Sequence, residues 1–213
     1  MFLSKVQINV ARRGARRLLG SPQAMHAAVL AAFPPGQGGR PLWRVDSYGT
    51  DVALYVLSEV RPDFTHLVEQ AGWPTTETWL TRSYEPVLNG LRTGQVYKFR
   101  LRANPTRSVR VREGARSQRV GHVTVAQQVS WLHSRASRIG ADLGAAEDPT
   151  FTVVQRSVER FNREGRTVTL STATFDGLLR VADEAALRSA IVQGIGPAKA
   201  YGCGLLTLAP ASP

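Results

Sequence analysis

The sequence GIGPAKAYGCG occupies positions 194–204, close to the C-terminal end of this chain of 213 residues. Four glycines and one proline among these eleven residues exclude a regular helix or strand. Glycine permits left-handed backbone angles and lets another molecule approach the main chain closely. Lys199 places a single ammonium group in the middle of the run. The stretch therefore predicts a loop, and its flanks decide which kind.

The flanks predict a helix before this loop and a strand after it. Residues 183–193 carry an apolar stripe behind Asp183, a suitable N-cap, and Gly194 stands where a helix ends. Residues 205–209 form a short apolar run. A dinucleotide-binding fingerprint needs the order strand, loop, helix, and a P-loop needs Gly-Lys-Ser/Thr. The order found here therefore argues against the first, and the absence of Gly-Lys-Ser/Thr argues against the second.

Two interpretations of the loop remain open. Successive backbone N–H groups in such a loop form a nest that suits phosphate oxygens. The alternative is a tight connection between helix and strand that binds nothing. In the first interpretation the contacts come from Gly194, Gly196, Lys199 and Gly202.

The rest of the chain predicts the same order of elements twice. Alternating apolar residues indicate strands, Ser21-Pro22 is typical of a helix start, and turn residues mark two hairpins. The first set is expected at 2–10, 21–33, 42–47, 51–57, 64–71 and 78–84, with a linker at 86–95. The second set is expected at 96–103, 124–139, 151–160, 167–181, 183–193 and 205–209. Each set has the order β-α-β-β-α-β, which predicts an α+β protein with two tandem ferredoxin-like domains, 1–90 and 95–213.

Composition points to an anionic partner. The net charge is +11, and 24 of the 27 basic residues are arginines, since only three are lysines. Arginine matches phosphates and guanine edges and stacks on bases, so nucleic acid is the favoured partner. Cys203 is the only cysteine, which excludes an internal disulfide and fits a reducing cytoplasm. No membrane span, metal site or other cofactor is expected, because no apolar run reaches about 18 residues and no zinc-ligand spacing occurs.

Three basic clusters are candidates for RNA contacts. One precedes the first helix, one lies on a single face of a predicted strand with no acid opposite it in sequence, and one surrounds the tip of the second hairpin. Like charges so close together favour a bound anion, and the alternative is an ordinary solvated surface. The clusters are Arg12, Arg13, Arg16 and Arg17; Lys98, Arg100 and Arg102; and Arg156, Arg160, Arg163 and Arg166.

His26 is the strongest candidate for chemistry. It follows the Ser21 cap by five residues and lies at the edge of an apolar stripe formed by Val29, Leu30 and Phe33. A neutral imidazole accepts protons near neutral pH, although a partly buried helix histidine with no chemical role has the same pattern. No pair of carboxylates has the placement of a two-metal phosphodiesterase. Phosphodiester cleavage would then use the ribose 2′-OH, with histidine as acid or base, and would require RNA.

The other histidines are weaker candidates. His66 and His133 are predicted to be surface residues of helices. His122 follows a glycine in a basic segment and is a possible phosphate contact.

Several segments together resemble the CasE family of CRISPR precursor-RNA endoribonucleases of type I-E systems, subunits of the Cascade complex. The resemblance covers nearly the whole chain. It is carried by MFLSK at 1–5, His26, FRLRANP at 99–105, GIGPAK at 194–199 and GCGLL at 202–206. The last two segments are the most specific.

The resemblance implies two ferredoxin-like domains and metal-independent cleavage at the base of a CRISPR repeat hairpin, leaving a 5′-hydroxyl and a 2′,3′-cyclic phosphate. It also implies that the protein keeps its guide RNA and carries it into Cascade, and we expect a monomer before RNA binds. His26 matches the catalytic histidine. Gln23 stands where family members often have tyrosine, and an amide positions a phosphate but supplies no phenolic proton. The alternatives are a non-catalytic RNA-binding subunit of such a complex and a basic protein that binds structured RNA broadly.

Overall fold

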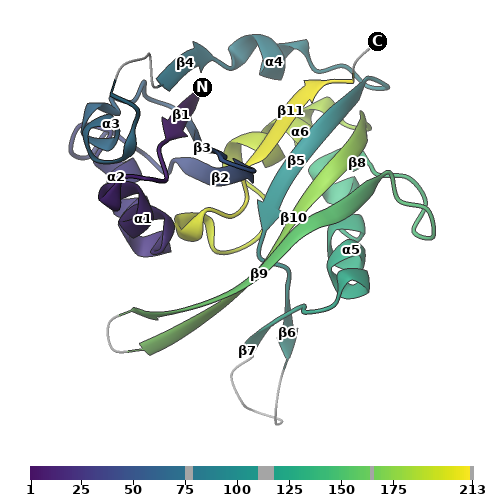
Figure 1. Ribbon diagram of the computed structural model, residues 1–213. Coiled ribbons are helices and arrows are strands. Elements are labelled where there is room, and N and C mark those ends of the chain that lie inside the picture. Colours follow the sequence, from purple (N-terminus) through teal and green to yellow (C-terminus); the bar gives the residue numbers. More distant parts are fainter. Residues whose placement is uncertain (75–78, 110–117, 164–165, 212–213) are drawn as a thin grey trace. The chain divides into compact units, whose positions relative to one another are not determined.

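The computed structural model (Figure 1) describes residues 1–74, 79–109, 118–163 and 166–211, without the side chains at 162, 163 and 166. The chain forms two compact units. Unit 1 contains Met1–Gly90 together with Lys199–Leu205, and unit 2 contains Leu91–Ala198 together with Leu206–Pro213. The chain therefore leaves the second unit after Ala198 and returns to it at Leu206. Lys199–Leu205 is called the crossing segment below.

Unit 1 is a four-stranded antiparallel sheet with helices. The sheet has the order β2-β3-β1-β4, which is the antiparallel order expected of a β-α-β-β-α-β fold. The strands are β1 Phe2–Ile8, β2 Leu42–Tyr48, β3 Asp51–Ser58 and β4 Trp79–Ser83. The helices are α1 Arg13–Leu19, α2 Pro22–Leu30, α3 Thr65–Ala71 and α4 Glu85–Gly90.

The core of unit 1 follows from the alternation in its strands. Val6 and Ile8 on β1 and Leu54 on β3 are buried on one face of the sheet, together with Met25 and Val29 of α2. Helix α2 begins as predicted, because the Ser21 Oγ accepts a hydrogen bond from the Ala24 backbone N–H at 3.2 Å. Its apolar stripe fixes which residues of α2 face away from the core.

Unit 2 repeats the topology with a longer hairpin. Strands β11, β5 and β10 are neighbours in that order, and β9 and β8 pair with successive parts of the far edge of β10. The strands are β5 Val96–Ala103, β8 Ala141–Asp142, β9 Phe151–Arg163, β10 Arg166–Val181 and β11 Leu206–Pro210. The helices are α5 Val125–His133 and α6 Glu184–Gln193, with single 3₁₀ turns η1 at Ser137–Ile139 and η2 at Lys199–Tyr201. Figure 1 shows the β9–β10 hairpin extending well beyond the other strands of its sheet.

Aromatic side chains form the core of unit 2. Trp131 of α5 stacks on Phe175 of β10 with ring centroids 6.4 Å apart. Phe151 on β9 meets the same Phe175 edge-on at 5.9 Å and contacts Phe99 on β5 at 6.2 Å. Offset and edge-to-face arrangements of this kind are favourable for aromatic rings. Phe99 thereby faces the core, so its neighbours Lys98 and Arg100 face the opposite side of the sheet.

The α+β prediction with two ferredoxin-like β-α-β-β-α-β units is confirmed, but two local predictions were wrong. The expected linker at 86–95 begins inside α4, which tolerates Pro86 because proline fits the first turn of a helix. The helix expected at 124–139 ends at His133 and is followed by the separate turn η1. Part of the segment between β5 and α5 forms a small hairpin of β6 Thr106–Val109 and β7 Gln118–Gly121. Among the described helices, none is long and apolar enough to cross a membrane.

Candidate active site and nucleic-acid interface

His26 lies in the middle of α2 and is half-buried. Its neighbour Met25 is 1% exposed and points into the core of unit 1, which orients α2. The His26 Nδ1 atom is itself buried. A proton exchanged with a bound molecule would therefore have to pass through Nε2. Gln23, one helical turn earlier, is also half-buried.

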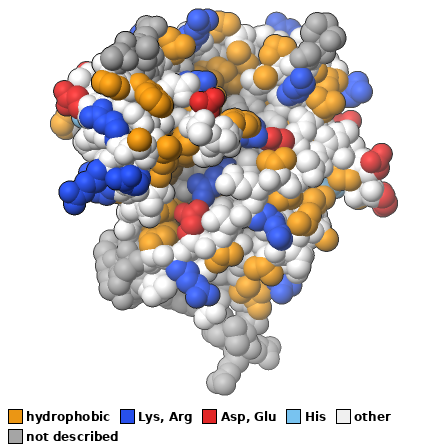
Figure 2. Space-filling model, viewed as in Figure 1, with side chains coloured by type: hydrophobic (Ala, Val, Ile, Leu, Met, Phe, Trp, Pro, Cys, Tyr) orange, Lys and Arg blue, Asp and Glu red, His pale blue; other side chains and the backbone are white. Residues whose placement is uncertain are grey.

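The arginines before α2 divide into two kinds. Arg13 and Arg16 of α1 are exposed, and Figure 2 shows Lys and Arg side chains gathered over the part of the molecule where α1 lies in Figure 1. Arg12 instead donates from Nη1 to the carbonyl oxygens of Val68 and Gly72, each at 3.1 Å. The Val68 carbonyl lies in the last turn of α3 and the Gly72 carbonyl follows it, and a cation is favourable at this end of a helix. Arg12 thus has a structural role that the sequence did not reveal, whereas the exposed pair remains available to an anion.

Helix α1 is held close to α3 by a glycine. A Cβ built at Gly14 would lie 2.2 Å from the Gln70 carbonyl oxygen, a distance that no side chain tolerates. Arg17 on the same helix is exposed and donates to the Gln70 Oε1 at 3.3 Å. The basic helix is therefore fixed on the scaffold that also carries α2.

The crossing segment brings the middle of the glycine-rich loop to α2. Turn η2, which contains Lys199, lies against both α2 and β2. A Cβ at Gly202 would lie 2.7 Å from the Trp43 ring, and Gly202 has a φ of +75°, so only glycine fits there. Lys199 is half-buried, and its burial, followed by the nearby Arg40 guanidinium, lowers the pKa of its ammonium group. Within unit 1, positive charge thus lies beside the helix of His26.

The first half of the glycine-rich loop belongs to unit 2. The left-handed angles predicted for the loop are present at Gly194, Gly196, Ala198, Gly202 and Gly204. A Cβ at Gly196 would lie 3.1 Å from the Trp131 ring, so this glycine allows the backbone to pass close to the core of unit 2. Of the four residues proposed to form the nest, Gly194 and Gly196 therefore belong to unit 2, whereas Lys199 and Gly202 belong to unit 1.

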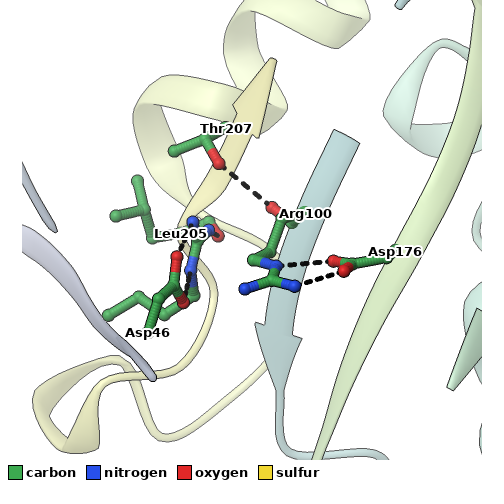
Figure 3. A network of polar contacts seen from close by, with 6 residues as sticks. Asp46, Arg100, Asp176, Leu205 and Thr207 are labelled. Carbon is green, nitrogen blue, oxygen red and sulfur yellow. Dashed lines mark hydrogen bonds and ion pairs between the residues drawn. The ribbon is translucent and has the colours of Figure 1, made fainter. Parts of the chain in front are cut away.

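The basic row on β5 has carboxylate partners that the sequence did not suggest. Arg100 forms a two-pronged ion pair with Asp176 on β10, with Nε 2.6 Å from Oδ1 (Figure 3). Arg102 is paired with Glu159 on β9. The premise that no acid opposes this row was wrong, because β10 and β9 supply the acids from distant parts of the chain. Lys98 is exposed, and RNA contact by this row stays a prediction.

The β9–β10 hairpin carries exposed cations on one face. Arg156 and Arg160 are both exposed, and Arg156 donates from Nη1 to the Val123 carbonyl oxygen at 3.2 Å. Alternate residues of a strand share a face, and this pair is separated by a multiple of two. The side chains of Arg163 and Arg166 lie outside the described part of the structure.

Two of the other histidines differ from the prediction. His66 and His133 are half-buried, and each ring Nε2 lies 2.9 Å from a backbone carbonyl oxygen, that of Ala28 and that of Gly144 respectively. They link elements of the fold, so the surface prediction was wrong. His122 is half-buried, and burial, followed by Arg107 and Arg135, lowers the pKa of its imidazole. Within the described ranges, no group of three His, Cys, Asp or Glu side chains could hold a metal ion.

A buried ion pair on β2 was not predicted from the sequence. The Arg44 Nε and Nη2 donate to the two carboxylate oxygens of Asp46 at 2.7 and 2.8 Å, and Nη1 donates to the Leu205 carbonyl oxygen at 3.0 Å. Asp46 and Leu205 are drawn at this point in Figure 3. Opposite charges two residues apart on a predicted strand were the available signal, since they share one face. The contact with Leu205 had no local signal, because 161 positions separate the two residues.

Comparison with known proteins gives a consistent result over the full chain. The family model described as "CRISPR associated protein" matches residues 1–210. The CRISPR-associated endoribonuclease Cse3 of Thermus thermophilus is 32% identical, covering 99% of this chain and 100% of the relative. The CRISPR system Cascade subunit CasE of Escherichia coli is 30% identical with the same coverage. A solved structure of T. thermophilus Cse3 bound to an RNA representing a pre-cleavage complex has a TM-score of 0.81, with 31% identity and 98% of both chains covered. The chain therefore belongs to the family of CRISPR-associated proteins that includes Cse3 and CasE.

Proposed function

We propose that this protein is a repeat-specific endoribonuclease that cuts CRISPR precursor RNA at the base of the repeat hairpin without a metal ion. The observation that carries the proposal is the placement of Lys199 beside α2, the helix of His26, within one compact unit. The exposed arginines of α1 stand on the same unit. The name of the Cse3 relative, a CRISPR-associated endoribonuclease, supports RNA cleavage.

The proposed reaction uses the substrate's own ribose. The 2′-oxygen forms a new bond to the neighbouring phosphorus, and the bond from phosphorus to the 5′-oxygen of the next nucleotide breaks. One proton leaves the 2′-OH and one is delivered to the departing 5′-oxygen, so the products are a 2′,3′-cyclic phosphate and a 5′-hydroxyl. His26 exchanges one of these protons through Nε2, since Nδ1 is buried. Cations near the phosphate, Lys199 first among them, stabilise the extra negative charge of the transition state.

The protein would keep its product. The basic surfaces bind RNA phosphates whether or not the bond below the hairpin is intact, so cleavage alone gives little reason for release. We infer that the guide RNA stays bound and enters a Cascade-type complex in the cytoplasm, where CRISPR transcripts are made. The CasE relative, named a Cascade subunit, supports this partner.

The direct test is a cleavage assay on labelled repeat hairpins in EDTA. Cleavage at one position at the base of the stem is expected, and a hairpin of the same composition but scrambled stem sequence is expected to remain intact. If the RNA is bound tightly but never cut, the non-catalytic alternative that Gln23 suggested is favoured. Cleavage only after addition of Mg²⁺ contradicts the proposed mechanism.

RNA binding should depend on salt through the exposed arginines of α1. Replacing Arg13 and Arg16 by glutamine removes two charges, and the slope of log K against log salt is expected to fall by about 0.7–0.9 for each RNA phosphate that is no longer neutralised. The measurement is RNA affinity over a series of KCl concentrations. Arg61→Gln, at an exposed arginine of unit 1 outside the predicted set, serves as the matched control. Equal slopes for all three proteins would remove α1 from the RNA interface.

A further inference from the structure

The crossing segment passes around the edge of the sheet in unit 1 and is held on both faces. Strand β2 is at the end of the sheet order, and its neighbouring residues Trp43 and Arg44 point to opposite faces. Gly202 packs on the Trp43 ring, which belongs to the core on the helix side. Three residues later, the Leu205 carbonyl oxygen accepts a hydrogen bond from Arg44 on the other face. The segment is thus fixed at two points, one before and one after it rounds the edge of β2.

The second of these points is built from charged groups that have been removed from water. Arg44 is 2% exposed and Asp46 is 5% exposed. Their two-pronged geometry compensates both charges, and the third guanidinium nitrogen, Nη1, donates to the carbonyl oxygen of Leu205, which is fully buried. Buried ion pairs contribute little net stability compared with well-packed apolar residues of the same volume. The hydrogen bond from Arg44 to the Leu205 carbonyl is a contact that an apolar pair could not make.

We propose that Arg44, oriented by Asp46, is a positioning residue for RNA cleavage. By holding the Leu205 carbonyl it fixes the crossing segment, and with it η2 and Lys199, against the helix that carries His26. This inference rests on the proposed function, because it assigns Arg44 a role in that same reaction. Arg44 is itself too buried to touch RNA, so its effect on the rate must pass through the segment.

The segment depends on such an anchor because it has little stiffness of its own. It is entered through Ala198, a residue with a φ of +65°, and it contains Gly202 and Gly204, both in left-handed conformations. Glycines leave the unfolded and locally open states highly flexible. A displacement of a positioning group by about 1 Å can cost a reaction about 100-fold. Loss of the anchor should therefore displace Lys199, although none of the residues proposed to contact the RNA has been substituted.

The test is the double variant Arg44→Met/Asp46→Leu, which removes both charges together and leaves no unpaired buried ion. Its single-turnover cleavage rate at saturating RNA is expected to fall about 10- to 100-fold, with hydrogen exchange accelerated in residues 199–206. The RNA dissociation constant should change much less, because the exposed cations remain. Arg44→Lys keeps a positive charge beside Asp46 but lacks the guanidinium fork that also reaches Leu205. Its melting temperature should therefore be closer to that of the wild type than its cleavage rate is.

Leu88→Ala is the matched control. Leu88 is a buried residue of α4 in the same unit, and its truncation lowers stability while leaving Arg44, Asp46 and Leu205 unsubstituted. A double variant that cleaves as fast as this control, or one whose exchange at 199–206 is unchanged, overturns the inference. If the double variant fails to fold, the cleavage rate of Arg44→Lys and its hydrogen exchange at 199–206 test the inference instead. If the wild type does not cut at all, the proposed function fails, and hydrogen exchange alone then supports or overturns the anchor.

Discussion

A repeat hairpin that carries one 2′-deoxyribose immediately 5′ of the scissile phosphate is expected to remain uncut by this protein. The nucleophile of the proposed reaction is the 2′-OH of that nucleotide, and a 2′-deoxyribose lacks this group. The substitution leaves every base and every phosphate unchanged, so RNA binding should be retained. The measurement is cleavage of the substituted and all-RNA hairpins in EDTA, over a time in which the all-RNA hairpin is fully converted.

Position makes this experiment specific. The same deoxyribose placed one nucleotide further from the scissile phosphate serves as the control and should be cut at close to the normal rate. If the substituted and all-RNA hairpins were cleaved equally fast, the nucleophile would have to be water, and a 2′,3′-cyclic phosphate could not form. Analysis of the 3′ end of the all-RNA product gives an independent check, because only attack by the 2′-OH produces the cyclic ester.

The fold was largely predictable because its signals are local. The alternation in β1, the Ser21 cap of α2 and the Asp183 cap of α6 are each visible within a few residues of sequence, and the structure confirms all three. The Asp183 side chain accepts from the Ala186 backbone N–H at 2.9 Å, as its position before an apolar stripe indicated. The order of these elements then left few topologies, because a repeated β-α-β-β-α-β pattern is itself a known motif.

The environment of the charged residues was much less predictable, because their partners come from distant positions. Arg100 was expected to lie in an uncompensated row, but antiparallel pairing of β5 with β10 places Asp176 directly opposite it. Arg12 was expected to join an exposed cluster, but α3 presents two carbonyl oxygens to it. Only strand register and helix packing decide these contacts, and neither is encoded in a short window of residues.

The surroundings of the histidines were also not predictable from the sequence. A histidine on a predicted helix gives the same sequence pattern whether it contacts solvent, a backbone carbonyl or a substrate. His66 and His133 have carbonyl oxygens beside Nε2, whereas in His26 the buried nitrogen is Nδ1. What distinguishes His26 is its helix, which lies against η2 and its lysine. That neighbour is 173 positions later in the chain, counted as 199 − 26, and only the fold brings it close.

Replacing His26 by alanine is expected to lower the cleavage rate by about 10²- to 10⁴-fold, which is the usual contribution of a positioned acid or base. RNA affinity should stay close to that of the wild type, because the phosphates are held by cations that the substitution leaves in place. The two measurements are the single-turnover rate at saturating RNA and the dissociation constant in the same buffer. Loss of rate without loss of binding separates the enzyme from a subunit that only binds.

Three measurements distinguish a histidine that transfers a proton from one that only supports the fold. Free imidazole added to the His26→Ala protein should restore part of the rate if the missing group transfers a proton, whereas it cannot repair a displaced helix. The limb of the pH–rate profile that His26 generates should disappear in the variant. His133→Asn, which removes a ring bonded to the Gly144 carbonyl, is the control and should change the melting temperature more than the rate. Should imidazole have no effect and His133→Asn slow cleavage as much as His26→Ala, the ring at position 26 would have no special part in the chemistry, and the proton would have to be transferred by another group.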